Sequence, residues 1–170
     1  MIDCVPLAGI DEEAIEDLLD RAFGPGRTSR TAYKVRGDAR PIAALSFAAV
    51  ADGTLIGSIQ SWPIALIPDR GDPADLVMIG PVAVEPARQG DGIGRLLMTR
   101  TLHAAHAAGC DEAMMLIGDP EYYGRFFGFG AESTADWRLP GPVERHRLLA
   151  KGMRVPRFAG MLGPRLPATA

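Results

Sequence analysis

Apolar residues at helical spacing predict a first helix over residues 11–23. Acidic residues fill its first turn, where the helix dipole favours them, and Gly24-Pro25-Gly26 ends it. The segment 28–38 predicts a short second helix. The apolar face of the first helix is formed by Ile15, Leu18, Leu19, Ala22 and Phe23.

Two apolar runs around a turn dipeptide predict an antiparallel hairpin. The run 45–51 meets Asp52-Gly53, which is typical of a two-residue hairpin turn, and a second strand follows. We expect Pro63 to interrupt this second strand near Trp62, because proline donates no backbone hydrogen bond.

A third apolar run, residues 76–84, predicts a buried strand that contains Gly80-Pro81. Proline is unusual in a central strand except at bulges, so we expect a break at Pro81. Such a break would release the backbone of Val82 to Val84 from regular pairing and leave it in need of a partner. A simple kink without any ligand is the alternative.

The rest of the chain alternates helices and strands. A helix is expected up to about Ala108 with Gly109 as its cap, then a strand over 113–118. A second helix follows between Asp119-Pro120 and Gly128, and short strands are expected within 137–150. A hairpin followed by inserted helices indicates an α+β fold, and the unit from 76 to 118 should be a parallel, right-handed βαβ unit.

Composition limits the classes of protein that the chain can belong to. Its 170 residues fit one domain, 1–170, and we see neither a secretory signal nor a membrane span, so we expect a cytoplasmic protein. Two cysteines and three scattered histidines predict no disulfide and no metal site. The net charge is −3, yet the segment from about residue 138 carries seven basic residues and one acidic residue. We expect this segment to pack against an acidic body rather than to bind nucleic acid.

The stretch "EPARQGDGIGRLLM", residues 85–98, holds glycines at 90, 92 and 94 between a strand and a helix. It is not a phosphate-binding P-loop, because no Gly-Lys-Ser/Thr triplet occurs. The dinucleotide fingerprint also fails, since Arg95 or Leu97 stands where its third glycine belongs. A helix start offers unpaired N–H groups and partial positive charge, and glycines let a phosphate approach them closely. A turn that only caps the helix is the alternative reading.

"QGDGIG" has the form Gln-x-x-Gly-x-Gly, and with its surroundings it resembles the GNAT superfamily of N-acetyltransferases. A strand ending in Val82-Ala83-Val84 precedes it, Arg88 lies beside it, and a tyrosine-bearing helix before Gly128-Phe129 follows. The resemblance covers about residues 1–150. It implies a three-layer α/β/α fold, whose mixed and mostly antiparallel central sheet is splayed at its parallel pair, and acetyl-CoA as co-substrate.

The resemblance also implies which residues bind the coenzyme, through backbone groups at the strand end and around the glycine loop. These residues are Val82, Ala83, Val84, Gln89, Gly90, Asp91, Gly92, Ile93, Gly94 and Arg95.

For catalysis, the resemblance implies direct attack of an amine on the thioester, with Tyr123 as general acid. The spacing before Gly128 is one residue longer than usual, so Tyr122 is a competitor. Backbone N–H groups near Val82 suit the oxyanion. Glu85 and Asp119 each follow a strand of the expected splayed pair and are candidate bases, although Asp119 would also serve as a helix cap.

Two functions therefore stay open from the sequence. The first is an N-acetyltransferase that acts on a small-molecule or peptide amine. The second is a non-catalytic acyl-CoA-binding or sensing module on the same fold. The acceptor and the oligomeric state also stay open, a homodimer included, and neither a nucleic-acid nor a membrane partner is expected.

Overall fold

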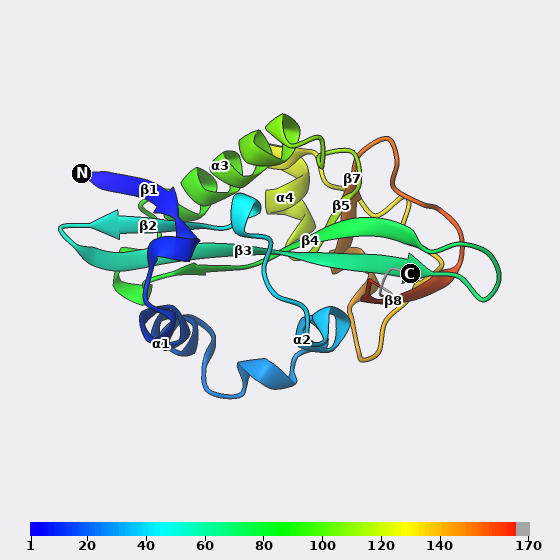
Figure 1. Cartoon of the computed structure of the whole chain (residues 1–170), viewed down its shortest axis with the longest axis horizontal. Coiled ribbons are helices and arrows are strands. Elements are labelled where there is room, and N and C mark those ends of the chain that lie inside the picture. Colours follow the sequence, from blue (N-terminus) through cyan, green and yellow to red (C-terminus); the bar gives the residue numbers. More distant parts are fainter. Residues whose placement is uncertain (166–170) are drawn as a thin grey trace. The chain divides into compact units, whose positions relative to one another are not determined.

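The computed structural model describes residues 1–165, which form a mixed sheet with four α-helices (Figure 1). The strand order is β1-β2-β3-β4-β5-β7, while β8 pairs with β3 and β6. The α+β prediction is therefore confirmed. The helices are α1 (Glu12–Phe23), α2 (Thr31–Arg36), α3 (Ile93–Ala107) and α4 (Pro120–Phe127). The strands are β1 (Ile2–Pro6), β2 (Phe47–Ala51), β3 (Thr54–Ile67), β4 (Ala74–Val84), β5 (Met114–Ile117), β6 (Trp137–Arg138), β7 (Leu148–Lys151) and β8 (Gly160–Pro164).

Contacts between residues divide the chain into two compact units. The first contains Met1–Thr28, Pro41–Ser61 and Ile79–Gly109. The second contains Ser29–Arg40, Trp62–Met78 and the chain from Cys110 onward. Strands β3 and β4 are each divided between the two units.

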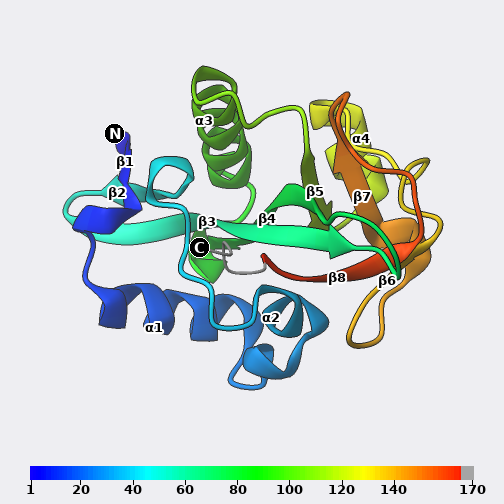
Figure 2. The same cartoon turned by 45° about the vertical axis from the view of Figure 1, so that its right-hand side comes forward.

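In the first unit, β2 pairs antiparallel with β1 and with the beginning of β3, and helices lie on both faces of these strands (Figure 2). The α1 face packs a core of Leu7, Ile15, Leu18, Leu19, Ala48 and Ala83. On the α3 face the approach is so close that a Cβ at Gly57 would lie 2.7 Å from Cγ2 of Ile93. The predicted helix over 11–23 is confirmed, with Gly24 as its C-cap.

The predicted hairpin is also confirmed. Asp52 and Gly53 both adopt positive φ, 50° and 76°, and Ala51 pairs with Thr54. Positive φ at both central residues is what a type I′ turn requires, so the dipeptide itself explains the turn.

The second unit is built on the parallel pair that the sequence predicted. β4 pairs parallel with β5 through Val77 with Met114 and Met78 with Met115, and β7 runs antiparallel on the other side of β5. Helix α2 packs against β8. The core consists of Val35, Trp62, Ile64, Leu66, Leu76, Met78, Met115, Trp137, Leu148, Ala150 and Leu162.

The expected interruption at Pro63 is wrong, because β3 continues through Pro63 to Ile67. β2 pairs with β3 as far as Ile59, and β8 pairs with β3 from Ile64. Pro63 therefore falls between the two pairings, where a missing N–H removes no hydrogen bond to either strand.

β4 likewise runs through Pro81 to Val84 as one strand, although its pairs with β5 end at Met78, before the proline.

The late strands expected within 137–150 are present as β6 and the beginning of β7, whereas β1 and β8 were not predicted. In the basic C-terminal segment, Arg138 pairs with Asp69 at 2.9 Å, and Arg165 donates to the carbonyls of Ile64 and Leu76. These contacts agree with a basic segment that packs on the protein. Among residues 1–165, no helix is both long and apolar enough to cross a membrane.

Candidate functional site

The glycine loop lies in the first unit, between the turn Pro86–Arg88 and α3. Gly90 and Gly92 have φ of 93° and 80°, in the left-handed region that favours glycine. The first intrahelical bond of α3 runs from the N–H of Leu96 to the carbonyl of Gly92, at 3.0 Å. The amides of Ile93 and Gly94 precede this bond, so the helix itself provides them with no acceptor.

Gly92 is the N-cap residue of α3, and it has no side chain with which to cap the helix. A Cβ added at Gly90 or Gly92 would have no protein atom within 4 Å. The backbone conformation, and not crowding by the protein, therefore requires these glycines. The same geometry leaves room for an anion to approach the amides at the helix start.

Arg88, which lies beside the glycine motif, forms an ion pair with Asp91 inside the loop. Its Nε lies 2.8 Å from Oδ2 of Asp91, and both side chains are more than one third exposed. An exposed pair of this kind is weak, so either group can exchange its partner for a ligand.

Val82, Ala83 and Val84 form the end of β4, beyond the pairs of β4 with β5. Ala83 is fully buried. The backbone N–H of Glu85 donates to the carbonyl of Ile56 at 2.8 Å, which fixes this end of the strand beside β3.

The carboxylate of Glu85, a candidate base, is bound by Arg21 of α1. Arg21 donates to Oε2 from Nε at 3.0 Å and from Nη2 at 2.8 Å. The hydrogen bond to Glu85 raises the pKa of the Arg21 guanidinium further above its ordinary value. The sequence did not indicate this pair, because its partners are 64 residues apart.

The second group of predicted residues lies in the second unit, on α4. Asp119 caps this helix, since Oδ1 accepts from the N–H of Glu121 at 3.0 Å, and Pro120 takes the first helical position. At the other end Gly128 is left-handed, and the N–H of Phe129 donates to the carbonyl of Tyr123 at 3.2 Å. Both predicted caps of α4 are confirmed.

Tyr123 packs its ring against a glycine at the end of β5. A Cβ at Gly118 would lie 2.5 Å from Cε2 of this ring. The pKa of Tyr123 is raised to about 12, mainly by burial; Tyr122 and Asp119 contribute to the rise, and Arg147 opposes it. Arg147 reaches the same place through its backbone, because its carbonyl accepts from the N–H of Gly118 at 2.9 Å.

The competing tyrosine, Tyr122, belongs to an aromatic cluster on α4. Its ring meets Tyr123 edge-on, with 4.9 Å between ring centroids, and also contacts Phe126 and Phe127. Both tyrosines contact aromatic rings, and Tyr123 also packs over a glycine.

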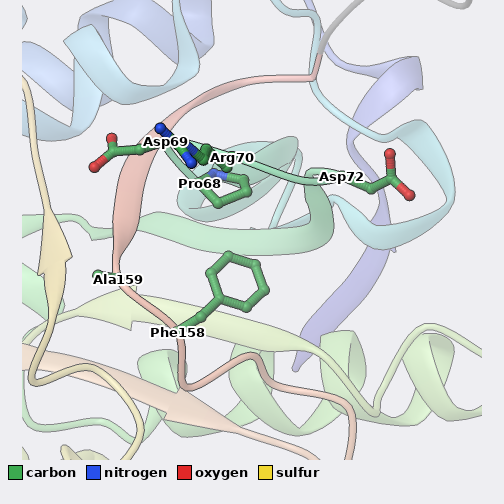
Figure 3. Close-up of a pocket in the computed structure, with 6 residues that line it drawn as sticks. All are labelled: Pro68, Asp69, Arg70, Asp72, Phe158 and Ala159. Carbon is green, nitrogen blue, oxygen red and sulfur yellow. The ribbon is translucent and has the colours of Figure 1, made fainter.

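The second unit also has a pocket of about 550 Å³ that the sequence did not predict (Figure 3). Phe158 points towards Pro68 there, and the carboxylates of Asp69 and Asp72 point away from each other. None of the lining residues belongs to the predicted site. The lining consists of Pro68, Asp69, Arg70, Asp72, Phe158 and Ala159.

Basic residues between α1 and the end of α2 contact the protein itself. The buried Arg27 binds Glu16 and Asp20, while the guanidinium of Arg36 lies 3.8 Å from the ring centroids of both Tyr33 and Trp62. Within the described part of the chain, His, Cys, Asp and Glu form no group of three or more that could hold a metal ion.

The sequence profile of the acetyltransferase (GNAT) family matches residues 12–129, which include the glycine loop and α4. The chain belongs to the GNAT acetyltransferase family. A search of curated proteins found no match for this GNAT protein.

Solved structures agree with this assignment at the level of the fold. The GNAT family N-acetyltransferase YhbS from Escherichia coli, in complex with CoA, is 24% identical with a TM-score of 0.72, covering 97% of this chain and 89% of that one. A GNAT family acetyltransferase from Brucella melitensis, in complex with acetyl-CoA, is 24% identical with a TM-score of 0.61, covering 94% and 93%. The ribosomal-protein-S18-alanine N-acetyltransferase from Escherichia coli is 18% identical with a TM-score of 0.55, covering 88% and 90%.

Proposed function

We propose that this GNAT protein transfers an acetyl group from acetyl-CoA to a primary amine, by direct attack of the amine on the thioester. The observation that carries the proposal is the start of α3, where Gly90 and Gly92 are left-handed and no side chain caps the helix. That two structures of the same fold were crystallised with CoA and acetyl-CoA supports it.

In this proposal the amides at the start of α3 hold the coenzyme pyrophosphate, because they combine unpaired donors with the positive end of the helix dipole. Arg95 adds positive charge, and Gln89, Gly90 and Asp91 shape the loop. The backbone of Val82, Ala83 and Val84 supplies hydrogen bonds to the pantetheine amides, and the N–H groups near Val82 stabilise the oxyanion.

Acetyl-CoA supplies an activated carbonyl carbon. A base on the protein removes one proton from the acceptor ammonium, the amine nitrogen bonds to that carbon, and the bond from carbon to sulfur breaks. As that bond breaks, Tyr123 gives its phenolic proton to the sulfur, and the second proton of the attacking nitrogen passes through water to restore the tyrosine. The products are the neutral amide and the CoA thiol, and the first proton leaves from the base to solvent. Because a thiol has a pKa of about 8.5 and Tyr123 one of about 12, full transfer to a free thiolate would be uphill by about 5 kcal/mol. Tyr123 must therefore act while the bond to sulfur is breaking.

Glu85 and Asp119 are the two candidate bases. Glu85 would have to share its carboxylate with Arg21, and Asp119 would have to share its carboxylate with the N–H of Glu121. Each group can act through a water molecule while it keeps its partner. Comparing Glu85→Gln with Asp119→Asn separates the two, because only loss of the base should lower kcat strongly.

The raised pKa of Tyr123 is the specific observation that favours the alternative function, a non-catalytic module that binds or senses acyl-CoA. A phenol that holds its proton so firmly is a weak acid. Under this alternative the glycine loop keeps its role, and Tyr122 and Tyr123 only pack α4 onto the sheet.

The deciding experiment follows free thiol released from acetyl-CoA in the presence of a panel of primary amines, namely amino acids, dipeptides, spermidine and an aminoglycoside. Thiol release that depends on one class of amine supports the transferase, and mass spectrometry of the product should show one added acetyl group. Calorimetric binding of CoA without turnover on any amine supports the binding module. Absence of CoA binding would contradict both. We place the reaction in the cytoplasm, with a small-molecule or peptide amine as partner.

A further inference from the structure

Three buried side-chain atoms among the described residues have no hydrogen-bond partner within the protein: Oγ of Ser58, Oε1 of Gln60 and Oγ1 of Thr101. An unsatisfied buried polar group costs roughly 1–3 kcal/mol of stability. Such groups are rare in native proteins, and each calls for an explanation.

Gln60 differs from the other two in chemistry and in the burial of the residue as a whole. A hydroxyl both donates and accepts and can rotate towards a nearby backbone group, whereas the amide oxygen of glutamine only accepts. Ser58 and Thr101 are fully buried, while Gln60 is 8% exposed. The amide oxygen itself is buried like the two hydroxyls, so a donor from outside the protein reaches it only when the side chain of Gln60 turns towards that donor.

The position of Gln60 follows from the register of β3 against β4. The hydrogen bond from Glu85 to Ile56, counted back along the two antiparallel strands, sets Gln60 near Pro81. Gln60 thus lies beside the beginning of the segment Val82–Val84, whose backbone is proposed to hold the reacting end of the coenzyme.

The face on which Gln60 lies follows from the alternation of side chains along β3. Gly57 faces α3, because a Cβ there would contact Ile93 and Leu97. Gln60 is three residues further along the strand, so its side chain points to the opposite face, which α1 covers (Figure 2). The helix proposed to carry the coenzyme is therefore on one face, and the unsatisfied amide oxygen is on the other.

We propose that Oε1 of Gln60 accepts a hydrogen bond from the protonated amine that is to be acetylated. This inference rests on the proposed function. It assigns Gln60 to the binding of a primary ammonium group, whose three N–H donors suit an acceptor without a partner. A neutral amide also suits the chemistry better than a carboxylate, because an ion pair would raise the pKa of the ammonium and hinder its deprotonation.

The test compares Gln60→Met with the native protein. Methionine keeps nearly the same length and volume but removes the amide oxygen. The KM for the best amine of the panel should rise about 10- to 100-fold, as expected for loss of a hydrogen bond to a charged group. The Kd of CoA, measured by calorimetry, should not change. The free energy of unfolding without ligands should stay equal or rise, because an unsatisfied buried group has been removed.

Gln60→Glu provides a second readout. The carboxylate still accepts from the ammonium, so the KM for the amine should stay low. The rise of kcat/KM with pH should move to higher pH, because the paired ammonium gives up its proton less readily. Ser58→Ala and Thr101→Val are matched controls, since each removes another buried unsatisfied oxygen, and neither should change the KM for the amine.

An unchanged KM in Gln60→Met would overturn the inference, and so would a marked loss of folding stability, which would indicate a structural role. If the native protein binds CoA but no amine of the panel binds to the CoA complex in calorimetry, the inference also fails, while coenzyme binding stands. Failure to bind CoA at all would instead contradict the proposed function.

Discussion

The starts of α3 and α4 are built in opposite ways. α4 is closed by its own sequence, because the side chain of Asp119 accepts from the N–H of Glu121 and Pro120 removes one donor. α3 begins at Gly92, which has no side chain to cap it. Each start follows the end of a strand of the parallel pair.

The two helix starts are suited to different roles in the proposed function. At α3 the proposed function assigns coenzyme binding to the backbone, which Gly90 and Gly92 leave accessible. At α4 the side chain of Asp119 caps the backbone, and the proposed function places the catalytic hydroxyl on Tyr122 or Tyr123 of this helix. Changes near α3 should therefore alter the binding of coenzyme, whereas changes on α4 should alter turnover or stability.

The largest expected effect is that of Tyr123→Phe on turnover. The variant keeps the ring that packs on Gly118 and removes only the hydroxyl, so kcat should fall by about 10²-fold or more, while the Kd of CoA stays the same. Steady-state kinetics and calorimetry measure the two quantities. Tyr122→Phe is the matched control, and a loss of kcat in that variant instead would move the acid by one residue.

The next effect concerns stability at high pH. Between about pH 10 and 12 the unfolded chain loses the Tyr123 proton while the folded chain keeps it, so the stability contribution is complete below pH 10 and disappears as the pH rises through 12. The native protein should lose about 2–3 kcal/mol more than Tyr123→Phe across this window, since one pKa unit equals about 1.4 kcal/mol. Urea denaturation of both proteins between pH 9 and pH 12 measures the difference. If the free energies of unfolding of the two proteins changed equally with pH, the pKa of Tyr123 would not be raised in the folded chain.

A smaller effect on CoA affinity should separate the contribution of side-chain charge from that of side-chain shape at the start of α3. Asn and Asp both tolerate the left-handed conformation of Gly92 and are nearly equal in size. Gly92→Asp should bind CoA about 10-fold more weakly than Gly92→Asn, because its carboxylate repels the pyrophosphate, and added salt should reduce the gap. Calorimetry at two salt concentrations measures it. Equal affinities would argue that the phosphates bind elsewhere.

The smallest effect is expected at the cap of α4. Asp119→Ala should cost about 1 kcal/mol of stability, whereas Asp119→Asn, which preserves a capping oxygen, should cost little. Chemical denaturation measures both variants, and the Kd of CoA should stay the same in each. A large loss of kcat in Asp119→Asn with normal stability would show that Asp119 is the base rather than only a cap.

The sequence predicted best those features that depend on neighbouring residues. The helix over 11–23, the Asp52-Gly53 turn and both caps of α4 are local patterns, and all of them are confirmed. The glycine loop was recognised for the same reason, since its spacing and its place before a helix lie within one short stretch.

Features that depend on distant partners were missed. β1 and β8 are short, and each becomes a strand only by pairing with β2 or β3 far along the chain. The error at Pro63 has the same origin, because the consequence of a missing N–H depends on where the neighbouring strands end. The pair of Arg21 with Glu85 and the unsatisfied oxygen of Gln60 likewise exist only in the folded chain.

Gly118 belongs to no motif, yet the packing around it limits which residues can replace it. Its backbone has no positive φ, so alanine would suit its conformation, but a methyl group would lie 2.5 Å from the ring of Tyr123 and 3.2 Å from Cδ1 of Leu116. A relative with alanine at this position must seat its aromatic ring differently, whatever its glycine loop looks like. When homologous sequences are sorted into groups, the residue at position 118 can therefore indicate how the tyrosine ring packs against the end of the strand.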